Sequence, residues 1–154
     1  MKRFWVILLS LTFIASGLAT AATGKIPAEF RGVQWGSAPS KLIKRSSGPV
    51  GQDKLEIWVP VNKRLGQFLG IPVAEEMFLF TNGKLYSGKL VIDTQDNFVK
   101  IKNELSKLYG KPDFINDSIK SYKWIWPSEK IQVSLYYEAK FQQAIVTFKT
   151  DKIK

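Results

Sequence analysis

The chain of 154 residues contains no cysteine and no histidine. These absences exclude a Cys/His zinc site, a haem histidine ligand, Ser-His-Asp and Cys-His nucleophiles, and an imidazole proton shuttle. They also exclude disulfide bonds, so burial of the apolar side chains, which make up 45% of the residues, must stabilise the fold. Carboxylate chemistry is the catalytic option that remains. We therefore expect neither a metal nor a cofactor, and we favour a protein that is not an enzyme.

A long apolar run is also missing, because no segment reaches the ~20 residues needed to span a bilayer. The nearest candidate lies at the start, where a mostly apolar stretch from Phe4 to Ile14 follows a basic beginning and precedes a run of small residues. This order is typical of a secretory signal peptide, here cleaved after Ala21 or Ala22. A retained membrane anchor is the alternative interpretation, whereas a lipoprotein would need a cysteine near the cleavage site.

We expect residues 1–22 to be this leader and residues 23–154 to form one domain, in the periplasm or outside the cell. Acidic residues are scarce in the chain: 13 Asp and Glu stand against 23 Lys and Arg, a net charge of +10. Such a charge favours anionic partners, namely a polysaccharide, a lipid headgroup, an acidic protein or a nucleic acid. Export makes a nucleic acid the least suitable of these. A solubility function is the alternative reading of the charge.

Local patterns predict two helices. Ser37 at an N-cap position and Pro39 at the helix start favour a short helix over Pro39–Arg45, before the stop signal Ser46-Ser47-Gly48-Pro49. A longer helix over Thr94–Tyr109 has apolar residues at helical spacing (Phe98, Ile101, Leu105 and Leu108) and a stop at Gly110-Lys111-Pro112.

Three strands are predicted after each helix, from period-two alternation and turn residues. They cover Leu55–Val61, Glu75–Phe80, Lys84–Ile92, Ser121–Trp126, Lys130–Tyr137 and Gln142–Lys149. Pro60 suggests that the first of them is an edge strand. The order predicts an α+β fold, an antiparallel sheet of about six strands with two helices on one face, built from a duplicated α-β-β-β unit.

Several segments carry a resemblance: Phe30-Arg31-Gly32-Val33-Gln34-Trp35-Gly36-Ser37, Asn82-Gly83-Lys84-Leu85-Tyr86, Leu105 to Pro112 and Trp124. They resemble a loose group of small exported bacterial proteins of unknown function. More distantly, the helix-then-hairpin units are similar to the domains of β-lactamase inhibitor protein and of the small lipoprotein of the outer-membrane assembly machine. The resemblance implies a protein-binding role without catalysis. The acylated cysteine of the assembly lipoproteins is absent here, and no functional residue is transferred.

Asn82-Gly83 predicts a two-residue hairpin that pairs Phe80 with Leu85. Uninterrupted pairing places Met77, Leu79, Tyr86, Leu90 and Ile92 on the core face. Phe78, Phe80 and Leu85 then lie on the opposite face, where they would form an exposed patch for binding. The alternative is that the Asn62–Pro72 loop folds over this patch.

Two more clusters are candidate binding sites. Tyr122, Trp124 and Trp126 share one strand face and would form either a platform for sugars and bases or part of the core under the second helix. Lys41, Lys44 and Arg45 lie within about one turn of the first predicted helix, as a phosphate or headgroup site requires, but a solvated helix face requires the same. Asp93 and Asp96 bracket a helix start and are better explained as capping residues than as a metal site.

The sequence therefore favours an exported binding or envelope-maintenance module that recognises a protein or an anionic envelope component. The alternative is a carboxylate-dependent hydrolase acting on cell-wall glycan, which needs two acids in one cleft. The candidate acids are Asp53, Glu56, Glu104, Asp113, Asp117, Glu129 and Glu138.

Overall fold

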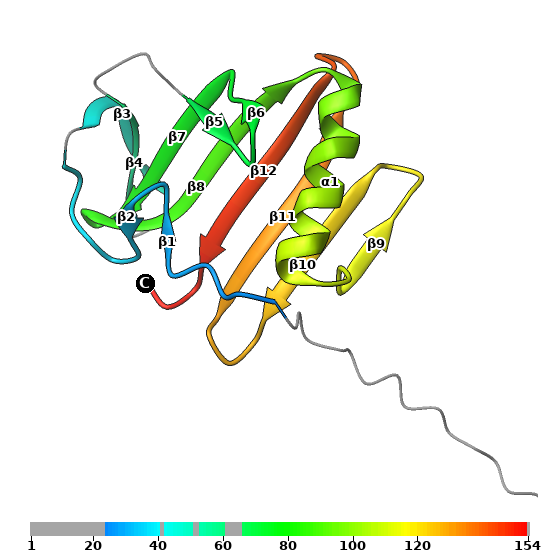
Figure 1. The fold of residues 1–154 in the computed structure, drawn as a ribbon. Helices are drawn as coiled ribbons and strands as arrows, with labels where there is room; N and C mark the ends of the chain where they lie inside the picture. Colours follow the sequence, from blue (N-terminus) through cyan, green and yellow to red (C-terminus); the bar gives the residue numbers. More distant parts are fainter. Residues whose placement is uncertain (1–23, 41, 51–52, 61–65, 154) are drawn as a thin grey trace, which may run out of the picture.

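A large antiparallel sheet dominates the computed structural model, which describes residues 24–40, 42–50, 53–60 and 66–153 (Figure 1). Its eight strands follow the order β3-β4-β7-β8-β12-β11-β10-β9. They are β3 (Leu42–Val50), β4 (Asp53–Pro60), β7 (Glu75–Thr81), β8 (Lys84–Asp93), β9 (Phe114–Asn116), β10 (Ser121–Trp126), β11 (Ile131–Glu138) and β12 (Gln143–Thr150). The helix α1 spans Gln95–Tyr109, and two small hairpins are formed by β1 (Glu29–Phe30) with β2 (Val33–Gln34) and by β5 (Gln67–Phe68) with β6 (Ile71–Pro72).

The predicted α+β fold with two helices is wrong, because the described residues are mostly β and contain one helix. The end of the first predicted helix belongs to β3, which pairs along its length with β4. The predicted helix has too short an apolar stretch to offset the free-energy cost of helix nucleation, whereas pairing with β4 provides backbone hydrogen bonds along the whole segment. Gly48 and Pro49, interpreted as a stop, are tolerated in β3 because it is an edge strand. Because the first helix is absent, the predicted duplication of an α-β-β-β unit is also wrong.

The correction extends to β4, which was predicted to be an edge strand because of Pro60. It lies between β3 and β7. Pro60 is its last residue, so the missing N–H falls at the end of the ladder.

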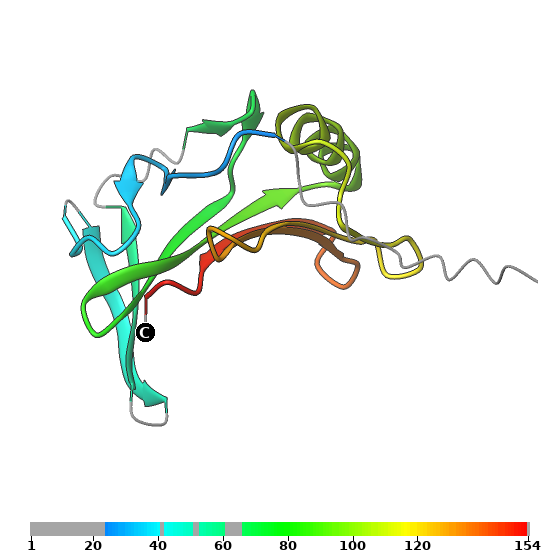
Figure 2. The same ribbon diagram turned by 90° about the horizontal axis from the view of Figure 1, so that it is seen from below.

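The helix and both small hairpins pack on the same side of the sheet, here called the inner face (Figure 2). Eight strands at about 4.8 Å spacing span more than 30 Å, whereas one helix covers about 10 Å. The helix therefore covers only part of the inner face. The rest is covered by the β1–β2 and β5–β6 hairpins and by the extended segment Gly24–Phe30, here called the strap (Figure 1).

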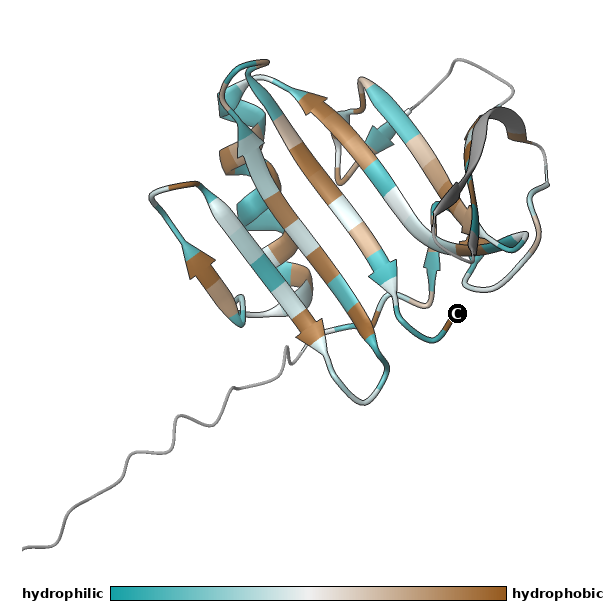
Figure 3. Cartoon of the chain, turned by 180° about the vertical axis from the view of Figure 1, so that it is seen from behind, coloured by the Kyte–Doolittle hydropathy of each residue, from teal (hydrophilic) through white to brown (hydrophobic). Residues whose placement is uncertain are grey.

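Local signals predicted the C-terminal half well. Thr94 caps α1 by accepting a hydrogen bond from the N–H of Asn97, and Gly110 ends the helix with a φ of 83°. Along β11, Ile131, Val133 and Leu135 are buried as the alternation predicted. Figure 3 shows the opposite, outer face, with hydrophilic and hydrophobic residues alternating along the central strands. One detail of α1 differs, because Tyr109 is buried where Leu108 was expected, and Leu108 is 38% exposed.

The β7–β8 hairpin contains a β-bulge that the sequence analysis missed. The turn forms at Asn82 and Gly83, with φ values of 49° and 75°, and Phe80 pairs with Leu85 as predicted. The next pair is Leu79 with Ser87, so Tyr86 is an additional residue in β8. A bulge of this kind reverses which face the following residues point to. Leu85 therefore shares the inner face with Leu90 and Ile92.

The exposed patch predicted at Phe78, Phe80 and Leu85 is consequently wrong. These side chains are 3%, 0% and 0% exposed and belong to the core. The alternative placed the Asn62–Pro72 loop over them, and part of that loop does pack on the core through Phe68 and Leu69. The described part of the chain holds no helix with the length and apolar character to cross a membrane.

Candidate functional site

The described residues of the two other predicted clusters lie in strands and outside any helix that the structure describes. Tyr122, Trp124 and Trp126 are buried, and Trp126 and Trp124 pack edge-on against Tyr109 of α1, so the alternative of core packing is confirmed. Lys41 lies outside the described residues. Lys44 and Arg45 lie in β3, where the register shifts between Lys44 and Ser46, so the helical turn that was to group the three cations does not exist.

The strap is anchored to the end of α1 by backbone hydrogen bonds. The N–H of Gly24 donates to the carbonyl of Tyr109 at 3.3 Å, and the N–H of Lys25 donates to the carbonyl of Leu108 at 3.2 Å. A Cβ at Gly24 would lie 2.0 Å from the Leu108 oxygen, so only glycine permits this approach. Because the carbonyls of a helix C-terminus lack partners within the helix, the strap serves as their cap.

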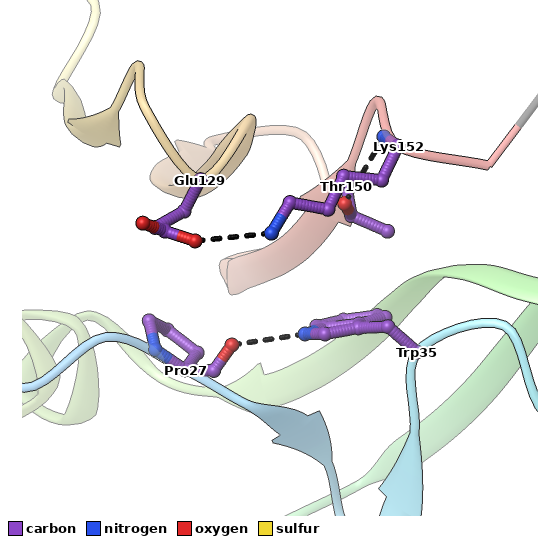
Figure 4. Close-up of polar contacts among 5 residues, drawn as sticks. All are labelled: Pro27, Trp35, Glu129, Thr150 and Lys152. Carbon is purple, nitrogen blue, oxygen red and sulfur yellow. Dashed lines mark hydrogen bonds and ion pairs between the residues drawn. The ribbon is translucent and has the colours of Figure 1, made fainter.

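The middle and far end of the strap are fixed by side chains. The indole Nε1–H of Trp35 donates to the carbonyl of Pro27 at 2.9 Å (Figure 4). The ring of Phe30 packs on Phe78 and Phe148, with ring centroids 5.0 and 5.6 Å away. The strap is therefore held at three points along its length.

Arg31 connects the strap to the β5–β6 hairpin. Its Nε lies 3.1 Å from Oε1 of the buried Glu76, and its Nη1 donates to the carbonyl of Gln67 at 2.8 Å. In the same hairpin, Phe68 contacts Phe148 edge-on at 5.8 Å between ring centroids. These contacts hold the hairpin over the inner face of the sheet.

A groove of about 460 Å³ opens where the strap, the hairpin and the end of α1 meet over the sheet. Phe148 of β12, Phe68 of the hairpin, and Leu108 and Tyr109 of α1 contribute to its lining. The strap contributes Lys25, Ile26, Pro27, Ala28, Glu29 and Phe30, and Arg31 follows directly after it. Ile26 and Leu108 are 40% and 38% exposed, so two apolar side chains of this lining face solvent. This surface is here called the strap groove.

The electrostatics of the strap groove are simple. Burial raises the pKa of Tyr109 to about 12, so its phenol is neutral at physiological pH. The guanidinium of Arg31 is paired with Glu76 at one end of the strap, and the exposed side chain of Lys25 lies at the other end. The lining therefore consists of apolar side chains with charged groups at its ends.

Most of the carboxylates considered for a hydrolase have partners within the chain. Six of the seven acids have described side chains, and each meets a donor. Their partners are Lys54 and Trp58 for Glu56, Lys107 for Glu104, the N–H of Ile125 for Asp113, Tyr122 for Asp117, Lys152 for Glu129 and the N–H of Lys140 for Glu138. Among the described side chains, no group of three or more acids is arranged to hold a metal ion.

Comparisons of the chain with protein-family models, curated proteins and solved structures found no match. The strap groove therefore has to be interpreted from its own residues. The sequence analysis missed it because its lining comes from four segments that are far apart in the chain. The one available signal was the Asn62–Pro72 loop, which the alternative interpretation placed over apolar side chains.

Proposed function

We propose that the chain is an exported binding protein without catalytic activity, and that the strap groove is where it holds the apolar part of an envelope component. The observation that carries the proposal is the groove itself. A volume of about 460 Å³ stays open there, and its lining is mostly apolar, whereas a second hollow of about 470 Å³ between Arg31, Leu42 and Phe78 has a more polar lining. Pockets of roughly 300–1,000 Å³ with such linings are typical of ligand sites.

The charge of the chain supports the same proposal. The net charge of +10 attracts anionic molecules, and loss of Lys2 and Arg3 with the leader would leave most of it in place. The composition adds a second argument, because the absence of cysteine and histidine leaves few catalytic mechanisms available. Together these features favour binding of an anionic envelope component over catalysis.

Site-specific photo-crosslinking in cells tests the proposal. A benzophenone amino acid replaces Leu108 in the groove and, in a matched control, Phe114 on the edge strand β9; the two positions are 38% and 43% exposed. We expect an adduct with an envelope component at position 108 and none at position 114. No adduct at position 108, or equal labelling at both positions, contradicts the strap groove as the binding site.

A further inference from the structure

We propose that the strap groove binds the acyl chain of a single-chain anionic amphiphile, for which a fatty acid is the simplest representative, with the anionic head at the Lys25 end. This inference rests on the proposed function, because it names the ligand class of the same site.

The lining favours a hydrocarbon chain over a peptide. A peptide brings N–H and C=O groups that all need partners, whereas methylene groups need none. Three carbonyls beside the groove are already paired, that of Pro27 with Trp35 and those of Leu108 and Tyr109 with the strap. The side chains that remain for contact are Ile26, Phe68, Leu108 and Phe148, which offer apolar surface.

The two ends of the strap differ in charge, and this difference orients the ligand. At the far end, Arg31 is neutralised by Glu76, and Glu29 adds an exposed carboxylate to the lining. At the near end, Lys25 forms no ion pair with any described acidic side chain, and its ammonium group is exposed. The carbonyls that give a helix C-terminus its partial negative charge are capped there by Gly24 and Lys25. An anionic head is therefore favoured beside Lys25.

Calorimetric titration tests whether the groove binds an acyl chain. The purified chain is titrated with fatty acids of increasing length, each kept below its micelle concentration. Each added methylene should strengthen binding about fourfold until the groove is full, as expected from the burial of hydrocarbon. The absence of binding, or an affinity independent of chain length, overturns the proposal.

Two matched substitutions locate the ligand. Ala28 lines the groove and Ala74 lies outside it, and both side chains are exposed. Ala28→Trp should fill the groove and weaken dodecanoate binding about tenfold or more, because several methylenes lose their place. Ala74→Trp should leave the affinity unchanged. Equal affinities of the two variants would place the ligand elsewhere and overturn the proposal.

Charge reversal tests the orientation of the head. Lys25→Glu should weaken dodecanoate binding about threefold or more at low salt, the size expected for one exposed ion pair, and should leave dodecanol binding unchanged. Lys89→Glu, on the outer face of β8, changes the net charge equally and should have little effect on either ligand. Equal weakening by both variants, or a loss of dodecanol binding in Lys25→Glu, contradicts the assigned orientation.

The crosslinking and titration experiments together distinguish a failure of this inference from a failure of the proposed function. Groove-specific crosslinking to a protein, combined with no fatty-acid binding, would retain the binding function and overturn the amphiphile. Failure of both experiments would overturn both.

Discussion

Gly88 shows how a missing side chain positions a segment far away in the sequence. It lies on the inner face of β8 between Phe78 and Phe148, and the ring of Phe30 occupies the space above it. A Cβ at this position would lie 2.2 Å from that ring. The glycine therefore makes room for the aromatic side chain that anchors the strap on the sheet.

Gly88→Ala should consequently destabilise the protein by about 1–3 kcal/mol, the usual cost of overpacking. Urea denaturation of the purified chain measures this change. In a Phe30→Ala background the same substitution should cost much less, because the clash is gone and the two effects are not additive. Fully additive losses would show that Phe30 does not rest on Gly88.

Ionisation of two tyrosines should lower the stability of the protein at alkaline pH. The hydrogen bond to Asp117, with burial, raises the pKa of Tyr122 to about 12, and burial raises the pKa of Tyr109 to about 12, from an ordinary value of 10.0. An unfolded chain loses these protons at lower pH than the folded chain. Their contribution to stability is therefore complete below about pH 10 and is lost as the pH rises toward 12.

Thermal denaturation between pH 8 and 12 checks this expectation. Tyr122→Phe and Tyr109→Phe should each make the decline in stability above about pH 10 shallower than in the wild type. At pH 8, Tyr122→Phe should cost about 1 kcal/mol for the lost hydrogen bond. Parallel curves for all three proteins would show that neither phenol is linked to folding.

At the scale of elements, α1 is the largest element on the inner face. Its stripe of buried side chains determines which side of the helix faces the sheet. Phe98, Ile101, Leu105 and Tyr109 are all buried, and Leu105 is fully buried. Leu108 lies beside this stripe and instead becomes part of the groove lining. One turn of the helix therefore contributes both to the core and to the candidate site.

Leu105→Ala should destabilise the protein by about 2–5 kcal/mol, because it leaves a cavity between the helix and the sheet. Asn103→Ala, on the exposed side of the same helix, should change stability by no more than about 0.5 kcal/mol. Lys102 is less suitable as the control, because its ammonium lies 5.1 Å from the centre of the Tyr122 ring. Equal costs in denaturant titrations would mean that the helix faces the sheet differently.

At the scale of the whole molecule, the groove exists because the sheet is wider than the helix that covers it. A sheet of eight strands is too wide for a single helix, so loops and the strap complete the cover. The space left between the strap, the β5–β6 hairpin and the end of α1 is the strap groove. A site of this kind depends on how separate segments meet rather than on any one motif.

Export is the other property of the whole chain, and it remains a prediction. Replacing Leu8 and Leu9 with aspartate should interrupt the apolar stretch and hold the precursor in the cytoplasm, since the leader is recognised by its apolar region. Mass spectrometry of the fractionated wild type should find the leader removed from the exported form. An exported protein that still begins at Met1 would contradict cleavage.

The sequence by itself determined the elements whose causes lie within a few residues. Thr94 and the Gly110-Lys111-Pro112 stop define α1, Asn82-Gly83 defines the hairpin turn, and the alternation along β11 defines a strand with one buried face. Each of these signals acts between neighbours, so no knowledge of the rest of the fold is needed.

Only the tertiary structure decided the rest. Residues 42–50 became a strand because β4 was there to pair with them, and the bulge at Tyr86 determined which side chains of β8 entered the core. The strap groove requires Phe30 to meet Gly88 and the strap to meet the end of α1, which are contacts between distant parts of the chain. Local propensities differ by less than about 1 kcal/mol per residue, whereas pairing a whole strand or burying an aromatic ring contributes more, so the global arrangement prevails where the two conflict.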